Sequence, residues 1–261
     1  MNGRATSRES TANPPELRPG DALILVDVQN DFCPGGALPV NEGDEIVPVL
    51  NRWIEAAKKA RAKIVASRDW HPPDHVSFRP RGGPWPVHCV QNTPGAELHP
   101  DLKLPARTSV VSKGTDPDRD SYSAFDGTRL GRNLKRRGVH RVWVGGLALD
   151  VCVRATVLDA LKAGFEVHLI KAGTRAVNVG ESDGQRALRE MQTAGCLIEE
   201  GGDDGPDAAR QPAPVSTVHG SLRADYGPGV RRRTPGSAGG VRAVLPPDAA
   251  GAKLPRRRRP R

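Results

Sequence analysis

The stretch VGGLALDVCVRATVLDALKAG, residues 144–164, decides the fold of this chain. It begins with a short apolar run of the kind that forms a buried strand, and the apolar residues after Cys152 are spaced as in an amphipathic helix. A strand that leads directly into a helix is the repeating unit of α/β proteins. Because the same succession recurs along the chain, the sequence predicts a doubly wound α/β fold.

Strand-like and helical segments alternate from residue 21 to residue 200. The apolar runs that predict strands lie at Ala22–Val26, Lys63–Ala66, Ser109–Val111, Arg141–Val144, Glu166–Ile170 and Leu197–Ile198. The helical patterns lie at Asp44–Arg61, Asp126–Arg137, Val151–Ala163 and Glu181–Ala194. The interval from Arg68 to Arg107 breaks the alternation and is rich in Pro, His, Trp and Gly. Loops of this length in a compact domain are usually functional.

Composition divides the 261 residues into three parts. We expect residues 1–20 to be a flexible segment, residues 21–200 to be one folded domain, and residues 201–261 to be a disordered tail. The tail carries +7 of the net charge of +9 and is rich in Pro and Gly, with too few large apolar side chains to offset its chain entropy. A nucleic-acid or acidic partner for its PRRRRPR end is less favoured than a solvated extension, because no aromatic residues interleave with the arginines.

The chain shows no sign of export or of membrane insertion. The first twenty residues lack the apolar core of a signal peptide, and no run of eighteen apolar residues occurs. The four cysteines, Cys33, Cys89, Cys152 and Cys196, are widely spaced and form no C-x-x-C pair. We therefore expect a soluble cytoplasmic protein without a membrane partner, in which the cysteines remain thiols.

Cys152 is the candidate nucleophile. At the first turn of a helix, the dipole and the free backbone N–H groups lower the pKa of a thiol and supply donors for an oxyanion. The alternative is an inert buried cysteine, which is the more common role of this residue type. Position at a helix start is therefore a weak signal unless other segments supply a base and a charge.

Two further segments supply these groups. The strand in DALILVDVQNDF ends at Asp27, and the short strand in TSVVSKG ends at Lys113. Taken alone, Asp27 or Lys113 is more simply interpreted as a solvated charge at the end of a strand. Together with Cys152 they lie at the carboxyl ends of predicted parallel strands, which is the edge where open α/β sheets bind ligands. A carboxylate in such a site can act as a general base.

The long loop contains a candidate metal site. In RDWHPPDHVSF, Asp69 and His71 alternate along an extended segment, and His75 and His88 follow within twenty residues. One carboxylate with two or three imidazoles suits a divalent transition metal such as Zn, Fe or Mn. The alternative is a set of surface histidines in a Pro-rich loop, and no zinc-finger spacing is present.

Five segments together carry a resemblance to a known family. They are VDVQNDFCPGG, SRDWHPPDHVSF, WPVHCVQNTPGAELHP, SKGTDPDRDSYSAF and GLALDVCVRATVLDALKAGFEV. In this order they resemble the nicotinamidases of the isochorismatase-like cysteine hydrolase superfamily, over about Asp21 to Glu199. The resemblance implies a six-stranded parallel sheet of order 3-2-1-4-5-6 flanked by helices. In that order, Asp27 and Cys152 follow neighbouring strands at the switch point.

The resemblance also implies a role for each matching residue. Cys152 becomes the nucleophile, Asp27 the base and Lys113 the third member of a triad. The residues that match metal ligands are Asp69, His71 and His88, with His75 at a position that is a direct ligand in some members and only nearby in others. The residues that match the aromatic surroundings of the substrate ring are Phe32, Trp85 and Tyr122. Leu147–Ala148 matches a non-proline cis peptide that turns the N–H groups of Ala148 and Cys152 toward an oxyanion.

The implied activity is hydrolysis of nicotinamide, a small pyridine carboxamide, to nicotinate and ammonia through a cysteine thioester in NAD salvage, with one divalent metal as cofactor. Val151 departs from the polar or aromatic residue that many relatives carry, and the tail has no counterpart in the minimal family. The alternatives are a related amidase for ureido, carbamoyl or pyrazinamide-like substrates, and a non-catalytic binding module that uses the basic tail. The sequence leaves open whether the chain forms a homo-oligomer.

Overall fold

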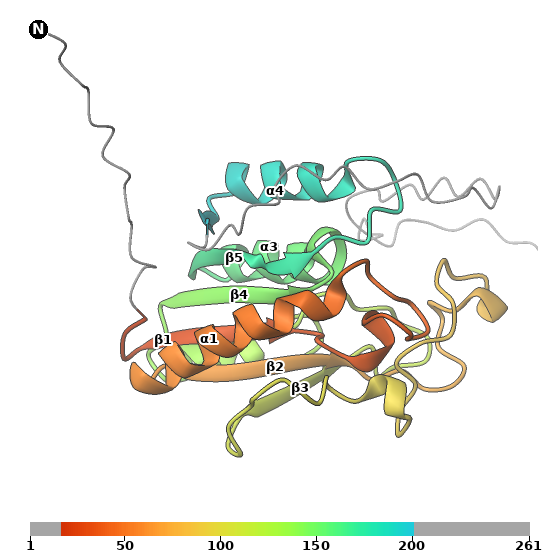
Figure 1. Ribbon diagram of the computed structural model, residues 1–261, viewed down its shortest axis with the longest axis horizontal. Helices are drawn as coiled ribbons and strands as arrows, with labels where there is room; N and C mark the ends of the chain where they lie inside the picture. Colours follow the sequence, from red (N-terminus) through yellow and green to blue (C-terminus); the bar gives the residue numbers. More distant parts are fainter. Residues whose placement is uncertain (1–16, 201–261) are drawn as a thin grey trace, which may run out of the picture. The chain divides into compact units, whose positions relative to one another are not determined.

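Six parallel strands form a single sheet in the computed structural model, which describes residues 17–200 (Figure 1). The strands are β1 (Asp21–Val26), β2 (Lys63–Asp69), β3 (Ser109–Lys113), β4 (Arg141–Leu147), β5 (Glu166–Arg175) and β6 (Leu197–Glu199). Their order is β3-β2-β1-β4-β5-β6, which confirms the predicted fold and order. Residues 1–16 of the expected flexible segment and the expected disordered tail, 201–261, lie outside the described residues.

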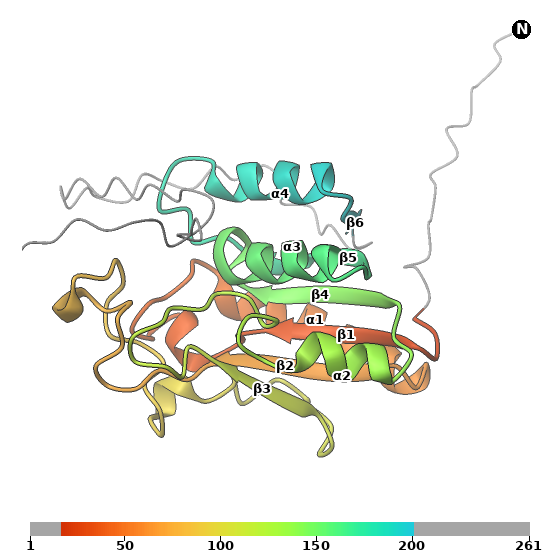
Figure 2. The same ribbon diagram turned by 180° about the vertical axis from the view of Figure 1, so that it is seen from behind.

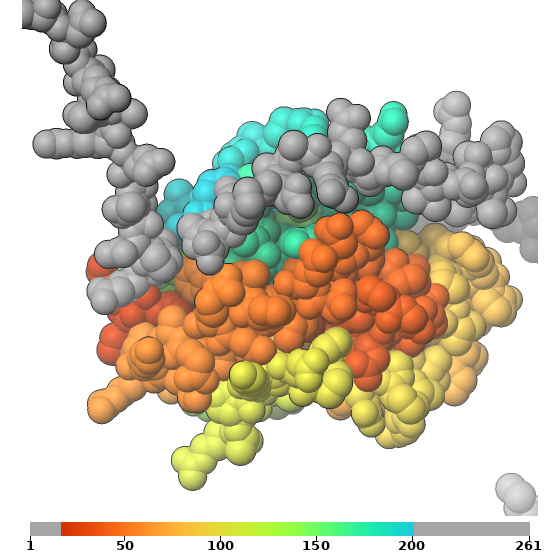
Figure 3. Space-filling view, in the orientation of Figure 1, coloured from red at the N-terminus to blue at the C-terminus, as the bar shows by residue number. Residues whose placement is uncertain are grey.

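Helices cover both faces of the sheet. They are α1 (Ile46–Lys59), α2 (Leu130–Arg136), α3 (Arg154–Lys162) and α4 (Asp183–Thr193). Helix α1 packs on one face, where Figure 1 shows it in front of the sheet and Figure 3 shows the surface that its side chains form. Helices α2 and α3 pack on the opposite face (Figure 2), and Met191 of α4 joins the same apolar cluster.

Helix α1 shows why these segments fold as they do. Its buried residues Ile46, Leu50 and Ile54 recur every four positions, so they form one apolar stripe along the helix. The stripe meets Leu23 and Leu25, which point to this face of β1. The adjacent residues of the strand point to the other face, as the two-residue period of a strand requires. A sheet that is covered on both sides needs such continuous apolar strands.

Most elements differ from the sequence-based bounds by one to three residues at an end, and two differ by more. Strand β5 continues five residues beyond Ile170, because it pairs with β4 again after a register shift between Val144 and Gly146. Helix α2 begins at Leu130 instead of Asp126. The preceding residues form a turn in which Asp126 donates its N–H to the Ser123 carbonyl, and the Thr128 hydroxyl accepts the N–H of Leu130.

The predicted long loop follows β2 and contains two short 3-10 turns, η3 (Arg79–Arg81) and η4 (Pro94–Ala96). It lies against the connection from β1 to α1, which contains the 3-10 turn η1 (Asn30–Phe32). An isolated antiparallel bridge between Gln29 and Leu98 joins the two segments. Both segments start at the carboxyl ends of their strands, so this edge of the sheet is enclosed. Within residues 17–200, no helix combines the length and apolarity needed to cross a membrane.

Candidate active site

Four neighbouring strands deliver four functional side chains to one edge of the sheet. Asp27 follows β1, Asp69 ends β2 and Lys113 ends β3, whereas Cys152 lies in a five-residue π-helical segment, Leu149–Val153, that follows β4. The order of these strands is β3-β2-β1-β4, so their carboxyl ends are adjacent. The topology therefore brings together residues that are up to 125 positions apart in the chain.

Lys113 lies at the centre of this group. Its Nζ atom is 2.9 Å from Oδ2 of Asp27, 2.5 Å from Oδ1 of Asp69 and 3.4 Å from Sγ of Cys152. Its side chain is fully buried. Burial alone would lower the pKa of this ammonium group, but the two carboxylates raise it well above its ordinary value. Lys113 is therefore a fixed cation beside both carboxylates and the thiol.

Asp27 is held in a single orientation. The hydroxyl of Ser67, two residues before the end of β2, donates a hydrogen bond to Oδ1 of Asp27 at 2.7 Å. This leaves Oδ2 on the side of Lys113. Burial raises the pKa of the Asp27 carboxyl above its ordinary value, although the Lys113 ammonium acts in the opposite direction. An ionised carboxylate in this environment is a stronger base than one in water.

The Cys152 thiol differs in one respect from the sequence-based prediction. Burial raises the pKa of Cys152 well above its ordinary value, and the Lys113 ammonium only partly offsets this effect. The predicted lowering of this pKa by the helix start is therefore wrong, because desolvation of a thiolate outweighs the effect of the helix dipole at this buried position. The resting thiol is protonated and needs a base. The preceding Leu147–Ala148 peptide bond is cis, as the family resemblance implied.

Three predicted metal ligands form a cluster. Single ligand atoms of Asp69, His71 and His88 lie within 4.8 Å of one another, and all three residues are buried. The Nδ1 atom of His71 lies 2.9 Å from the Gly114 carbonyl, and that of His88 lies 2.8 Å from the Pro86 carbonyl. Since a carbonyl only accepts, each ring donates from Nδ1, and in its neutral form each ring then has a free electron pair on Nε2. This donor set fits a divalent metal.

His75 lies beside this cluster and not in it. Its Nδ1 is 2.7 Å from the Ser77 hydroxyl, and its Nε2 is 3.2 Å from the Arg119 carbonyl. Its ring lies against that of His71, with centroids 4.2 Å apart. Both ring nitrogens of His75 thus have partners outside the cluster, whereas Nε2 of His71 lies 3.7 Å from Oδ2 of Asp69, inside the cluster.

A glycine makes room for one of the ligands. Gly114 follows β3 with φ of +60°, and a Cβ atom there would collide with the His71 ring. The same residue supplies the carbonyl that orients that ring. Gly114 is thus required for two reasons, its backbone conformation and the close approach of the imidazole.

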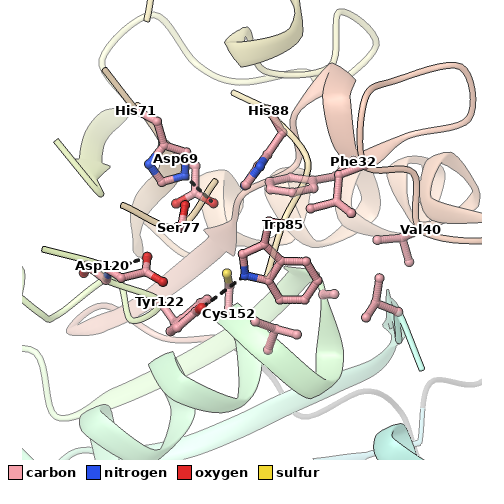
Figure 4. Close-up of a pocket in the computed structure, with 15 residues that line it drawn as sticks. Phe32, Val40, Asp69, His71, Ser77, Trp85, His88, Asp120, Tyr122 and Cys152 are labelled. Carbon is pink, nitrogen blue, oxygen red and sulfur yellow. Dashed lines mark hydrogen bonds and ion pairs between the residues drawn. The ribbon is translucent and has the colours of Figure 1, made fainter. Parts of the chain in front are cut away.

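The cluster and the thiol face one cavity (Figure 4). Figure 4 shows Asp69, His71 and His88 on one side and the sulfur of Cys152 on the other. The predicted aromatic residues Phe32, Trp85 and Tyr122 all line the cavity, as does Ala148. The indole N–H of Trp85 donates to the Tyr122 hydroxyl at 3.1 Å, which fixes two aromatic side chains relative to each other. Asp27 and Lys113 are not among the residues that line the cavity.

Sequence reasoning missed part of the cavity wall. The additional lining residues are Leu38, Val40, Ser77, Asp120, Ser121, Val151 and Val177. The position of Val177 at the site could have been predicted, because this residue follows the carboxyl end of β5, the next strand in the sheet order. The position of Ser67 could also have been predicted, since the alternation of strand residues places it on the same side of β2 as Asp69. Leu38 and Val40 lie in an irregular connection, and their positions could not have been predicted.

Comparisons with known proteins agree with this geometry. The isochorismatase domain model matches residues 21–200. The nicotinamidase of Escherichia coli (strain K12) is 43% identical over 201 residues, covering 69% of this chain and 94% of that protein. The pyrazinamidase of Pyrococcus horikoshii in complex with zinc has a TM-score of 0.66 and 53% identity, covering 69% of this chain and 98% of its own. PnC1 from L. infantum in complex with nicotinate has a TM-score of 0.63 and 39% identity, covering 69% and 92%.

Proposed function

The chain belongs to the isochorismatase family, and from this premise we propose that it is a nicotinamidase, which hydrolyses nicotinamide to nicotinate and ammonia. One observation carries the proposal. The Asp69 carboxylate is within 4.8 Å of ligand atoms of His71 and His88 on one side, and within 4.8 Å of Asp27 and Cys152 on the other. The metal cluster and the nucleophile therefore lie on either side of the Asp69 carboxylate. A small aromatic ring that bears a carboxamide can reach both groups at once.

The cavity can hold such a substrate in one orientation. The ring would pack among Phe32, Trp85 and Tyr122, with its carboxamide at the Cys152 sulfur and its nitrogen directed at the cluster of Asp69 and the histidines. Aromatic side chains give a flat ring a large apolar contact, while the few polar groups set its direction. The nicotinate complex of the L. infantum relative supports a pyridine ligand for this fold.

The first half of the reaction uses the triad. Asp27 accepts the thiol proton, and the sulfur of Cys152 attacks the carboxamide carbon. The backbone N–H groups of Ala148 and Cys152 donate to the oxyanion that forms. The C–N bond then breaks, Asp27 returns the proton to the nitrogen, and ammonia leaves a thioester on Cys152. Lys113 stabilises the ionised forms of Asp27 and of the sulfur through opposite charge.

The second half consumes water. Asp27, again ionised, accepts a proton from a water molecule that attacks the thioester carbon. The C–S bond breaks and the proton returns to the sulfur, which regenerates the thiol and releases nicotinate. One water is consumed and one ammonia released per cycle, so the enzyme needs no redox partner. This reaction returns the pyridine ring for NAD salvage.

The residues of the cluster fit one divalent metal, held by Asp69, His71 and His88, with His75 nearby. Such a metal would supply a Lewis-acidic partner for the pyridine nitrogen and so would help to orient the ring. The nitrogen and oxygen donors suit Zn, Fe or Mn, and the zinc complex of the P. horikoshii relative supports zinc. Burial lowers the pKa of His88, which keeps its imidazole neutral as a ligand must be.

Pyrazinamide is a second candidate substrate. Its ring has a nitrogen at the same distance from the carboxamide as that of nicotinamide, and the P. horikoshii relative is a pyrazinamidase. The remaining wall contains apolar side chains such as Leu38, Val40 and Val177, so it tolerates the exchange of a ring C–H for a nitrogen. We place the activity in the cytoplasm, since all four cysteines are free thiols.

Substitution of the nucleophile tests the proposal. We expect Cys152→Ala to abolish ammonia release from nicotinamide and to leave the circular dichroism spectrum unchanged, because alanine retains the backbone but has no nucleophile. Cys196→Ala is the matched control, since Cys196 is also buried but lies outside the cavity. Substantial ammonia release by Cys152→Ala, or none by the wild-type protein, would contradict the assignment.

A further inference from the structure

Gln29 follows the point where the backbone hydrogen bonds between β1 and β2 end. The pairing of β1 with β2 ends at Leu25 and Ala66, and the last backbone contact is the Asp27 N–H donating to the Ser67 carbonyl. Asp27 has φ of +47°, so the chain turns away from β2 at this point. Two residues later, the Gln29 side chain points back to β2 and is fully buried.

The carboxamide of Gln29 continues the ladder that the backbone has left. Its Oε1 accepts the N–H of Asp69 at 2.7 Å, and its Nε2 donates to the carbonyl of the same residue at 2.8 Å. The second N–H of Nε2 serves the Ala96 carbonyl at 2.9 Å. Both N–H groups and the oxygen of the side-chain amide therefore form hydrogen bonds. The amide pairs with the backbone of Asp69 as a residue of a neighbouring strand would.

We propose that Gln29 is a positioning residue that fixes the Asp69 carboxylate between the metal cluster and Lys113. Asp69 is held on its other side by β3, where it is in register with Lys113 and where Trp70 donates its N–H to the Lys113 carbonyl. Gln29 supplies the only comparable clamp on the β1 side among the described residues. With both sides held, the backbone of Asp69 fixes the direction of its side chain.

This direction matters because one carboxylate serves two groups. Oδ1 of Asp69 is 2.5 Å from Lys113 Nζ, while Oδ2 faces His71 with 3.7 Å to its Nε2. A small rotation of the Asp69 peptide moves both oxygens together. A loosened clamp therefore weakens metal binding, since partners that orient a ligand contribute about 10- to 100-fold in metal affinity.

The chemistry of the site selects glutamine. Glutamate would place an oxygen against the carbonyls of Asp69 and Ala96, where only a donor is tolerated. Asparagine is one methylene shorter and falls short of Asp69. Methionine has nearly the same length and no hydrogen bond, so Gln29→Met removes the contacts while it fills the space. The inference rests on the metal site of the proposed function but not on the identity of the substrate.

The test is the zinc dissociation constant, measured on the folded full chain by competition with a chromophoric chelator. We expect Gln29→Met to weaken zinc binding by about 10- to 100-fold. Gln91→Met is the matched control, because Gln91 also donates from Nε2 to a backbone carbonyl, that of Trp70 at 2.9 Å, one residue beyond Asp69. This control should bind zinc as the wild-type chain does.

Turnover gives a second readout that a merely structural role would not produce. Added zinc should restore much of the nicotinamide turnover of Gln29→Met, because its defect lies in metal affinity. Gln29→Asn, which keeps an amide but not the reach, should behave as Gln29→Met does.

Three outcomes would overturn the inference: unchanged zinc affinity in both Gln29 variants, equal weakening in Gln91→Met, or loss of the folded state in both Gln29 variants, which would make the residue a determinant of folding alone. If the wild-type chain binds zinc but releases no ammonia from nicotinamide, the substrate assignment fails and the affinity test of Gln29 still stands.

Discussion

The replacement of Lys113 by methionine tests whether a buried cation holds the site together. Lys113 is fully buried and lies within 3 Å of Oδ atoms of both Asp27 and Asp69. Methionine fills the space but leaves two buried carboxylates without their cation. Removal of one partner from a buried ion pair costs about 3–5 kcal/mol, because the remaining charge has lost both water and its counter-ion. For a chain of this size, with about 2–4 °C per kcal/mol, the expected fall in Tm is about 6–20 °C.

A surface lysine provides the control. Lys58 forms an ion pair of similar length with Glu55, 2.8 Å, but both side chains are about half exposed. Exposed pairs contribute little to stability, so Lys58→Met should leave Tm within the error of the scan. Thermal unfolding followed by circular dichroism, with the same added zinc for all variants, measures both. Lys113→Met should also lower kcat by about 100-fold or more, because Asp27 loses the cation that keeps it ionised, and a positioned general base contributes at least about 100-fold. Equal Tm values for the two variants would refute the argument from burial.

Two further predictions follow from the buried groups. We expect elemental analysis of the purified protein to find about one divalent metal per chain, and the double substitution His71→Ala and His88→Ala should remove it, because two ligands disappear. His99→Ala should retain it, since His99 lies in the same loop but outside the cluster; full metal content in the double variant would rule out these ligands. Burial raises the pKa of Cys33 to about 11 and that of Cys196 to about 12, so iodoacetamide at pH 8 should label both slowly in the folded protein and rapidly in urea. Because both values exceed the ordinary pKa of 9.0, the stability that these thiols contribute is complete below pH 9 and is lost as the pH rises through 11 to 12. Rapid native labelling at pH 8, read by mass spectrometry, would contradict the burial of these thiols.

The sequence predicted the strands well because their signal is local. The run Ala22–Val26 is apolar at every position, and β1 is buried on both faces throughout. The end of β5 had no such signal, because its last five residues, KAGTR, are mostly polar or small. They join the sheet only through the second pairing with β4, a contact between segments far apart in the chain. Tertiary pairing thus decided a boundary that local pattern could not.

The chemistry-bearing residues were equally open to prediction, since Asp27, Lys113 and Cys152 each lie at or just beyond a predicted strand end. The residues that hold these side chains in place were less open to prediction from the sequence. In the sequence, Gln29 is one polar residue in a predicted turn. Its hydrogen bonds join it to Asp69, forty positions later in the chain. The pKa of Cys152 was predicted in the wrong direction for a related reason. A helix start is visible in the sequence, whereas the burial that outweighs it depends on the whole fold.

Strand order explains why one lysine serves both halves of the site. Asp27, Asp69 and Lys113 belong to β1, β2 and β3, which are adjacent in the sheet at a spacing of about 4.8 Å. A lysine side chain on the outermost of these strands is long enough to cross β2 and reach the carboxylate that follows β1. On its way it passes the carboxylate that ends β2, which also faces the histidines. The nucleophile and the metal cluster therefore share one cation and one carboxylate, so a change at either centre should alter the other.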